Sequence, residues 1–363
     1  MSMRIGCCIT PHGFGHAART AAILEAIGRR LVVQGVIGTT VPRWFFNDSL
    51  SISFSYSRLT TDIGLIQKNS LVEDLPATRQ ALDRFYPLSN DCIDKAADIF
   101  KDCDCILCDI APLGIAAARR LGIPSLLIEN FTWDWIYSGY QRQLPALGVH
   151  IEHLAELYGQ ADYHLQTDPV CRPVAGAVRI PPVSRIGKKD RRWIRRFLGI
   201  DEQAIVVLVT MGGLARDDYN MGSLQQAGKH VFLLAGKGKS LTISGNIYQL
   251  PRQCGLYHPD LIAASDLVVG KVGYSTLAEV YAAGVPYAYV CRETFRESAI
   301  LAEFIEHNNI GLAIGAVDFQ SGRWLQRLPE LLSIGSGKKP RENGANVAAR
   351  FITDRLFVQR QLG

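Results

Sequence analysis

Residues 258–297 are the segment that most constrains the fold, because they read in succession as a strand, a glycine turn, a helix and a second strand. Residues 266–270 form a short apolar run that stops at the turn. Thr276 has the residue type of a helix N-cap, and Gly284, with Pro286 just beyond it, is typical of a helix end. Repeated along the chain, such units predict α/β domains with parallel sheets.

The glycine turn between the first of these strands and its helix is suited to binding a phosphate. Free backbone N–H groups, the positive end of a helix dipole and two hydroxyl groups meet there. The candidate phosphate-binding residues are Lys271, Gly273, Tyr274, Ser275 and Thr276.

Glu279 lies one turn into the same predicted helix, and two roles are open for it. Its carboxylate can accept hydrogen bonds from both hydroxyls of a ribose. It can also complete a capping box with Thr276, in which case it only bonds back to the N-cap N–H. The spacing alone leaves both roles open.

Length and composition set the broad class of the protein. The chain has 363 residues, of which 48% are hydrophobic and 20% charged, so we expect a globular protein of two domains. No apolar run reaches the ~18 residues that a membrane span needs, and the N-terminus lacks a signal-peptide layout. Nine cysteines, an odd number, indicate a reducing cytoplasm rather than a disulfide framework. A net charge of +5 does not by itself indicate nucleic acid.

A second glycine turn follows the first predicted strand, residues 3–10, and leads into a helix. Gly13, Gly15 and Ala18 match the dinucleotide fingerprint, but no acid follows the next strand to hold an adenosine ribose, so a nicotinamide cofactor is disfavoured. His16 stands at the helix start, where the dipole lowers the pKa of an imidazole. It is therefore a candidate general base, or alternatively a residue that only hydrogen-bonds locally.

Residues 105–109 read as a core strand whose end delivers Asp109 as a second candidate catalytic residue. Asp102 and Asp104 have the spacing of a metal-binding pair, but they precede this strand instead of ending it. The cysteines in and beside the strand alternate between its faces and do not form a ligand set. The sequence therefore predicts no metal.

The glycine turns resemble those of a known family. The motifs His258-Pro-Asp-Leu and Gly270-Lys-Val-Gly-Tyr-Ser-Thr, with Glu279, resemble the donor-nucleotide site of GT-B glycosyltransferases. They resemble more closely the glycosyltransferase-like N-terminal half of L-arabinokinases and its free-standing bacterial relatives. The loop HGFGHAAR at residues 12–19 is similar to the first loop of that family and, more distantly, of the peptidoglycan N-acetylglucosaminyltransferase.

The resemblance implies roles for further residues. A segment similar to the family's NFSWDxIY word would contact the sugar or acceptor, although its aromatic residues can equally pack between domains; the acceptor-binding candidates are Asn130, Trp133 and Asp134. Further residues would contact the nucleotide sugar, namely Gly13, Gly15, Gly212, Gly213, Arg296 and Glu297.

Residues 188–197 form a basic amphipathic helix that carries two aromatic side chains. A solvated surface helix that leads into the second domain is the favoured interpretation. A patch that contacts a lipid surface is the alternative, and peripheral membrane contact therefore stays open.

The resemblance implies the GT-B arrangement, two doubly wound Rossmann-like domains facing a central cleft. We expect an acceptor-side domain at 1–168, a linker at 169–200, a nucleotide-sugar domain at 201–340, and a helix at 341–363 that crosses back to the first domain. The expected activity is metal-independent glycosyl transfer from a nucleotide-diphosphate sugar, with a uridine diphosphate (UDP) sugar as the expected donor. The acceptor would be lipid-linked or a small molecule, and neither a cofactor nor a nucleic-acid partner is expected. Hydrolysis or epimerisation of the nucleotide sugar, or binding without catalysis, are the alternatives.

Overall fold

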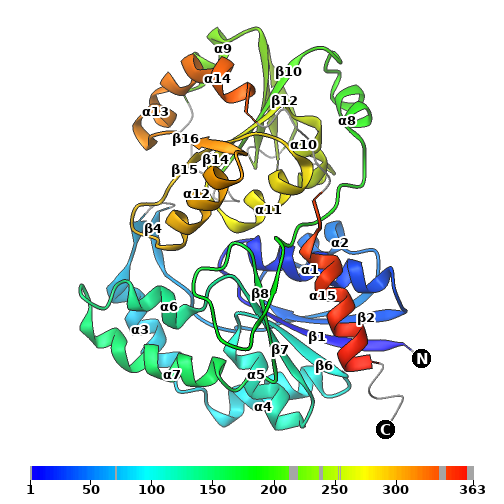
Figure 1. Ribbon diagram of the computed structural model, residues 1–363, viewed down its shortest axis with the longest axis vertical. Helices are drawn as coiled ribbons and strands as arrows, with labels where there is room; N and C mark the ends of the chain where they lie inside the picture. Colours follow the sequence, from blue (N-terminus) through cyan, green and yellow to red (C-terminus); the bar gives the residue numbers. More distant parts are fainter. Residues whose placement is uncertain are drawn as a thin grey trace. The chain divides into compact units, whose positions relative to one another are not determined.

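The computed structural model describes residues 2–69, 72–211, 220–236, 240–251, 253, 255–334 and 341–357. The chain folds into two compact units (Figure 1). The first contains Met1–Ser184 and Glu342–Gly363, and the second contains Arg185–Arg341. The second unit is therefore inserted into the sequence of the first.

The first unit is built on a parallel seven-stranded sheet with the order β3-β2-β1-β6-β7-β8-β9. Its strands are β1 (Met3–Ile9), β2 (Val33–Thr39), β3 (Ser53–Arg58), β6 (Cys105–Asp109), β7 (Ser125–Glu129), β8 (Tyr163–Thr167) and β9 (Val178–Ile180). A separate antiparallel pair consists of β4 (Gln67–Asn69) and β5 (Val72–Glu73).

Helices connect these strands in sequence, and one helix arrives from the far end of the chain. They are α1 (Gly15–Gly28), α2 (Arg43–Ser49), α3 (Leu75–Phe85), α4 (Asn90–Phe100), α5 (Pro112–Leu121), α6 (Trp133–Ser138), η1 (Pro145–Leu147), α7 (Gly148–Tyr158), α15 (Gly344–Ile352) and the short π-helical η3 (Thr353–Phe357). In Figure 1, α15 (red) lies beside α1 (blue), and the two helices share one buried apolar cluster with β1.

The second unit repeats the same architecture on a second seven-stranded sheet, with the order β12-β13-β11-β10-β14-β15-β16. Its strands are β10 (Ile205–Thr210), β11 (His230–Ala235), β12 (Thr242–Ser244), β13 (Ile247–Leu250), β14 (Leu267–Lys271), β15 (Tyr287–Val290) and β16 (Gly311–Ala313). Its helices are α8 (Arg191–Leu198), α9 (Met221–Gln226), α10 (His258–Ala264), α11 (Tyr274–Ala283), α12 (Glu297–His307), α13 (Ala316–Ser321), η2 (Arg323–Arg327) and α14 (Leu328–Leu332). Strand β12 is antiparallel to β13.

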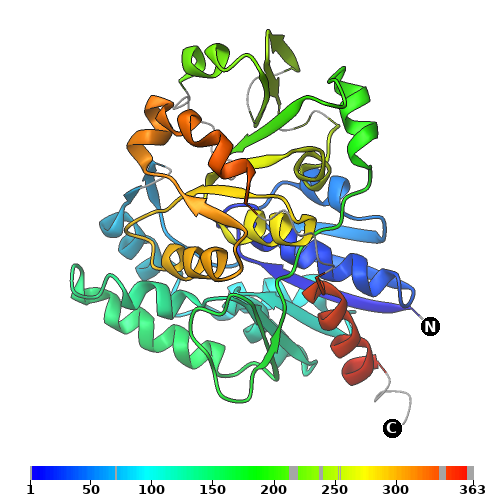
Figure 2. The ribbon, with the colours of Figure 1, turned by 45° about the horizontal axis from the view of Figure 1, so that its top comes forward.

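The central strand β10 shows why this sheet reads as a continuous apolar run in the sequence. Val206 and Leu208 belong to an apolar cluster with α8, α10, α11 and α12. Val207 and Val209 point to the other face, into a cluster with α9, α13 and α14. Helices cover both faces (Figure 2), so both sets of side chains are buried, as in doubly wound α/β proteins.

Each sheet has one place where the strand order reverses. In the first unit it lies between β1 and β6, and in the second between β10 and β14. Loops at the carboxyl ends of two such strands diverge to opposite faces and leave a crevice, where open α/β sheets bind ligands. His16 follows β1, Asp109 is the last residue of β6, and the turn after Lys271 follows β14.

Residues 169–200, expected as a linker, are divided between the two units. Strand β9 pairs with β8 and extends the first sheet. The boundary falls after Ser184, so α8 belongs to the second unit. Among the described residues, no helix is both long and apolar enough to cross a bilayer.

Candidate functional site

His16 and Asp109 meet at the place in the first unit where the strand order reverses. Nδ1 of His16 lies 2.9 Å from Oδ1 of Asp109. Both side chains are buried, and that of Asp109 is 0% exposed. Nδ1 also lies 3.0 Å from Nη2 of Arg19. In the tautomer that carries its proton on Nδ1, the imidazole donates to Asp109, because a carboxylate only accepts hydrogen bonds. The other ring nitrogen, Nε2, is then an acceptor and can take a proton.

The surroundings of His16 keep it neutral. Burial lowers the pKa of His16 below its ordinary value of 6.5, and the nearby Arg19 adds to this effect, while Asp109 opposes it. Phe131 packs edge-on against the imidazole, with the ring centroids 5.8 Å apart. A neutral imidazole in a fixed orientation is suited to general-base chemistry at neutral pH.

Arg19 was not among the predicted site residues, but its hydrogen bonds connect Asp109 and Asn130. Its guanidinium, 1% exposed, donates to both oxygens of Asp109, at 3.0 Å from Nε and 2.5 Å from Nη2. Thr20 donates to the same carboxylate at 3.0 Å. Burial would raise the pKa of Asp109, but Arg19 and His16 outweigh it and hold that pKa below its usual value. With its oxygens engaged, Asp109 is arranged to orient His16.

A second buried acid, Asp62, lies at the same edge of the first sheet and was also missed. Thr10, just after β1, donates to Oδ1 of Asp62 at 2.8 Å. The indole N–H of Trp133 donates to Oδ2 at 3.0 Å. Burial raises the pKa of Asp62 to about 7, although these two hydrogen bonds oppose the rise.

The three predicted acceptor-binding residues are buried and contact other protein groups. Asn130 accepts from Arg19 Nη1 at 2.9 Å, which joins it to the His16 cluster. Trp133 is 1% exposed, so its ring has no open face for a sugar in this conformation. Asp134 forms an ion pair with Arg172 at 2.7 Å through Oδ2. Oδ1 of Asp134 is buried without a hydrogen-bond partner among the described residues.

In the second unit the helix after the glycine turn begins earlier than the sequence predicts. Gly273 is the N-cap of α11 and Tyr274 is its first residue, so the expectation of Thr276 as N-cap was wrong. Thr276 lies inside the helix, which excludes the capping box that it would form with Glu279. Gly273 has no side chain that could cap α11. The first backbone N–H groups of the helix, which have no partner within it, therefore lie at the turn.

Glu279 instead joins a buried ion-pair cluster within the second unit. Arg185 Nε and Nη2 each lie 2.9 Å from Oε1, and His258 Nδ1 lies 2.8 Å from Oε2. Burial would raise the pKa of Glu279, but Arg185 and His258 hold it below its usual value. A carboxylate can accept about four hydrogen bonds, two at each oxygen. Arg185 makes two contacts with Oε1 and His258 makes one with Oε2, so Oε2 can accept one more.

The remaining predicted residues are distributed as follows. Gly13 precedes α1 with φ of +79°, a conformation that favours glycine, and Gly15 is the first residue of α1. Lys271 ends β14, and its carbonyl accepts from Tyr287 at 2.6 Å. Ser275 lies in α11; Arg296 is the N-cap and Glu297 the first residue of α12. Gly212 and Gly213 lie outside the described residues.

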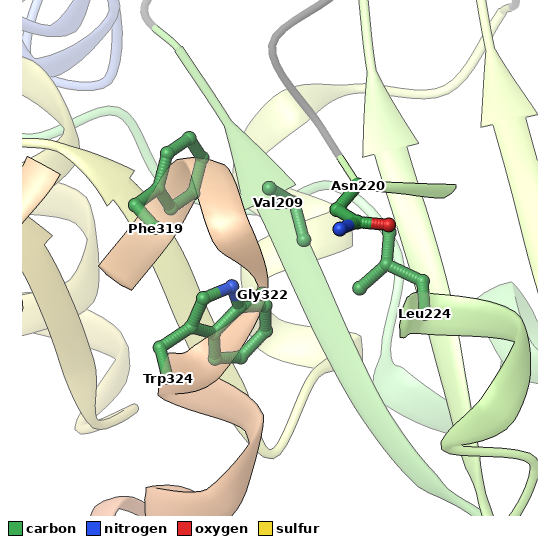
Figure 3. Close-up of a pocket in the computed structure, with 6 residues that line it drawn as sticks. All are labelled: Val209, Asn220, Leu224, Phe319, Gly322 and Trp324. Carbon is green, nitrogen blue, oxygen red and sulfur yellow. The ribbon is translucent and has the colours of Figure 1, made fainter. Parts of the chain in front are cut away.

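A small cavity also lies in the second unit, against β10 (Figure 3). Its volume is about 10 Å³, enough for one water molecule at most. It is lined by Val209, Asn220, Leu224, Phe319, Gly322 and Trp324. In the described part of the chain, no three His, Cys, Asp or Glu side chains are grouped so that they could hold a metal ion.

Comparison with sequences of known proteins gives one informative relative. The chain is 27% identical over 365 residues to L-arabinokinase of Arabidopsis thaliana, covering 95% of this chain and 34% of that protein. The chain thus spans about a third of the length of this curated relative. No family model matches the chain.

Several solved structures similar to the whole chain are glycosyltransferases. A UDP-glucosyltransferase from Polygonum tinctorium is similar with a TM-score of 0.63 and 14% identity, covering 98% of this chain and 99% of that one. Phytolacca americana UGT2, complexed with UDP-2fluoro-glucose and pterostilbene, has a TM-score of 0.58 and 13% identity, covering 98% and 94%. MurG of Acinetobacter baumannii has a TM-score of 0.52 and 16% identity, covering 99% of both chains. The comparisons confirm the predicted fold class: this chain has the GT-B fold, with two Rossmann-like domains.

Proposed function

We propose that the protein is a glycosyltransferase that transfers a sugar from a nucleotide-diphosphate sugar, with a UDP-sugar as donor, to a hydroxyl group of an acceptor. The observation that carries the proposal is the contact between His16, which follows β1, and the buried Asp109 at the end of β6, in a GT-B fold. The similar structures include a UDP-glucosyltransferase and complexes with UDP or UDP-2fluoro-glucose, which favours that donor.

In this proposal His16 acts as the general base. Its Nε2 takes the proton of the acceptor hydroxyl as the oxygen attacks the anomeric carbon of the donor sugar. The bond from that carbon to the diphosphate oxygen breaks, and the nucleoside diphosphate leaves with the bonding electrons. Asp109 stabilises the imidazolium that forms, because its carboxylate already accepts the Nδ1 proton.

The second unit would hold the donor. The first N–H groups of α11, after Gly273, would bind the diphosphate, and Lys271 would add positive charge to stabilise its departure. Oε2 of Glu279 would accept a ribose hydroxyl while Arg185 and His258 hold the carboxylate in place. Because these groups supply the positive potential, we propose that the reaction requires neither a metal ion nor a cofactor.

The test has two parts, binding and turnover. Calorimetry with UDP, with and without a chelator, measures binding to the second unit; a chelator that abolishes binding would reject the metal-free proposal. Incubation with a panel of nucleotide sugars, with and without small-molecule and lipid-linked acceptors, then measures release of the nucleoside diphosphate. His16→Ala should bind UDP normally and lose turnover by ~10²–10⁴-fold.

The variant Glu279→Gln tests whether Glu279 binds the ribose of the donor. Loss of the charged hydrogen bond to ribose should weaken UDP binding by roughly ten- to a hundred-fold, equivalent to ~1.5–3 kcal/mol. Arg185 is buried beside it, so the melting temperature must be measured on the same variant. A lower melting temperature with unchanged UDP affinity would assign Glu279 a structural role only.

A second candidate is binding of a nucleotide sugar without transfer. It is favoured by the sequence relative, whose name describes a kinase and of which this chain matches 34%. Tight UDP-sugar binding, with an intact donor in every acceptor mixture, would support this second function. Free sugar and nucleoside diphosphate without acceptor would indicate a hydrolase, and an isomerised donor an epimerase.

A further inference from the structure

Helix α8 carries two aromatic side chains that are exposed instead of being buried in the core of its unit. Ile194 and Leu198 of this helix are buried in the second unit. Trp193 and Phe197, one turn apart, are 42% and 56% exposed. Their rings stack on one another, with the centroids 5.2 Å apart and the planes at 9°. Figures 1 and 2 show α8 at the periphery of the second unit.

The charged residues of α8 divide into a structural and an exposed set. Arg191 and Arg195 pair with Asp266 at 2.6 Å and 2.8 Å, and so anchor the helix to its unit. Arg192 and Arg196 are exposed and lie beside the aromatic pair in the helix.

The segment just before the helix adds two more exposed cations. These are Lys188 and Lys189, and Nζ of Lys189 lies 4.9 Å from the centre of the Trp193 ring. Asp190 is the one exposed acid in this stretch, and its carboxylate is used to cap α8 by accepting from the Trp193 N–H at 2.7 Å. We call Lys188, Lys189, Arg192, Trp193, Arg196 and Phe197 the α8 face.

We propose that the α8 face binds an anionic lipid surface. Aromatic rings on a helix, flanked by cations, suit the boundary between headgroups and acyl chains, where rings insert and cations meet phosphate groups. With four cations and one carboxylate, this segment has a net positive charge, which is complementary to the negative charge of an anionic leaflet. The two rings stack on one another, so one face of each is already covered, which disfavours the stacking on bases that single-stranded nucleic acid would need. The proposal does not depend on glycosyl transfer.

The experiment is sedimentation of the full chain with sucrose-loaded vesicles. Vesicles of phosphatidylcholine alone are compared with vesicles that also contain phosphatidylglycerol, at low and at high salt. Two double variants change the α8 face: Trp193→Ser with Phe197→Ser, and Arg192→Glu with Arg196→Glu. A matched control, Ile243→Ser with Val317→Ser, removes exposed apolar groups elsewhere in the same unit. Melting temperatures verify that each variant is folded.

The wild type and the control should bind the phosphatidylglycerol vesicles, and high salt should weaken this binding. The charge variant should lose at least about 25-fold in partitioning, because each cation near such a surface contributes about fivefold. The aromatic variant should lose binding to a similar degree. Absence of vesicle binding by the wild type, or equal losses in the control, would overturn the proposal. So would a change of oligomeric state in the α8 variants, or preferential binding of single-stranded DNA, since either assigns the face to another partner.

Discussion

At the scale of single residues, the cluster around His16 separates the groups that can react from those that position them. Arg19 and Asp109 form a fully buried ion pair, and such a pair is costly to bury unless every oxygen and N–H is bonded. Here Thr20 donates to Asp109, and Asn130 accepts from Arg19, which adds two more hydrogen bonds to the pair. His16 contacts this buried pair through Nδ1, which lies 2.9 Å from Oδ1 of Asp109 and 3.0 Å from Nη2 of Arg19, so Nε2 is the ring nitrogen left for chemistry.

We predict that Arg19→Gln raises the pKa of His16. The guanidinium disfavours a proton on His16 and neutralises Asp109, so its loss leaves an unbalanced carboxylate beside the imidazole. The pKa of His16 should move from below 6.5 toward or above that value, which would be measured by NMR titration of the ring. If His16 is the base, the acid limb of the rate–pH profile moves to higher pH in parallel.

Arg19→Lys is the matched control for this prediction. It keeps the positive charge but loses the two-pronged contact with Asp109. Its His16 titration should therefore stay closer to that of the wild type. The Gln variant should also unfold more easily, by about 3–5 kcal/mol, because it leaves a buried charge unpaired. An unchanged titration in folded Arg19→Gln protein would show that Arg19 has no electrostatic role at His16.

The raised pKa of Asp62 predicts that the stability of the folded protein falls as the pH rises. Its pKa is about 7 in the folded chain against 3.8 when unfolded, so the folded state holds a proton that the unfolded state releases. Stability from this group is present at low pH and is lost as pH rises toward and past 7. Relative to Asp62→Asn, which cannot titrate, the wild type should lose about 3 kcal/mol between about pH 5 and pH 8. Urea unfolding at the two pH values measures this, and a constant difference would contradict it.

The positions of the candidate residues were predictable where a residue ends or follows a strand, but their pairing over long distances in the sequence was not. His16 and Asp109 were each singled out because they end or follow strands, but nothing in the sequence joins residues 93 positions apart. Arg19 left a usable signal, because it follows His16 by three residues and lies on the same side of the helix. Asp62 left none, since it stands in an irregular segment without a motif.

At the scale of elements, β14 and the turn after it predict opposite results for two glycines, Gly270 in the strand and Gly273 in the turn. A Cβ on Gly270 would overlap the carbonyl oxygen of Thr210 on β10. Gly270→Ala should therefore force β10 and β14 apart and cost about 3 kcal/mol or more of stability, as overpacked sites do. A Cβ on Gly273 meets nothing within 4 Å, and its φ of −161° suits any residue, so Gly273→Ala should fold normally.

The variants Gly270→Ala and Gly273→Ala also test the proposed phosphate site. If phosphate binds at the N-terminus of α11, the methyl group of Gly273→Ala lies where the ligand must approach the backbone, so UDP affinity should fall while the melting temperature does not. Calorimetry and thermal unfolding of both variants provide the measurements. Normal UDP binding by Gly273→Ala would place the phosphate elsewhere.

The boundaries of α11 show where prediction of elements from sequence succeeds and where it fails. Its end at Gly284, in a left-handed conformation with φ of 64°, was predicted because glycine is the residue that such a turn favours. Its start was wrong because Thr276 has the preferred N-cap side chain, whereas the actual N-cap, Gly273, contributes no side chain at all. The contacts of Glu279 then follow from tertiary packing, since Arg185 and His258 lie in distant parts of the sequence.

At the scale of the whole molecule, the chain passes between its two units twice. The second crossing brings α15 into the first unit, where Ala345, Ala348 and Ile352 are buried in the same apolar cluster as β1 and α1. Asn343 caps α15 by accepting from Ala345 N–H at 2.9 Å, and it also accepts from the backbone N–H of Ser184 at 3.2 Å. Helix α15 is thus part of the unit that carries His16.

This connectivity predicts that damage to α15 unfolds the first unit and leaves nucleotide binding in place. Ala348 is 0% exposed, so Ala348→Asp buries an unpaired charge and should cost roughly 3–5 kcal/mol. Hydrogen exchange should then rise in peptides of β1 and α1 at denaturant concentrations where β10 and β14 stay protected. UDP affinity should persist under those conditions, because the residues proposed to bind UDP, namely Lys271, Glu279 and the first residues of α11, belong to the second unit. Asn346→Asp, an exposed position on the same helix, adds the same charge and should change stability by less than about 0.5 kcal/mol. If both units lost protection together and UDP affinity fell with them, the two units would fold as one, and the donor site could not be assigned to the second unit alone.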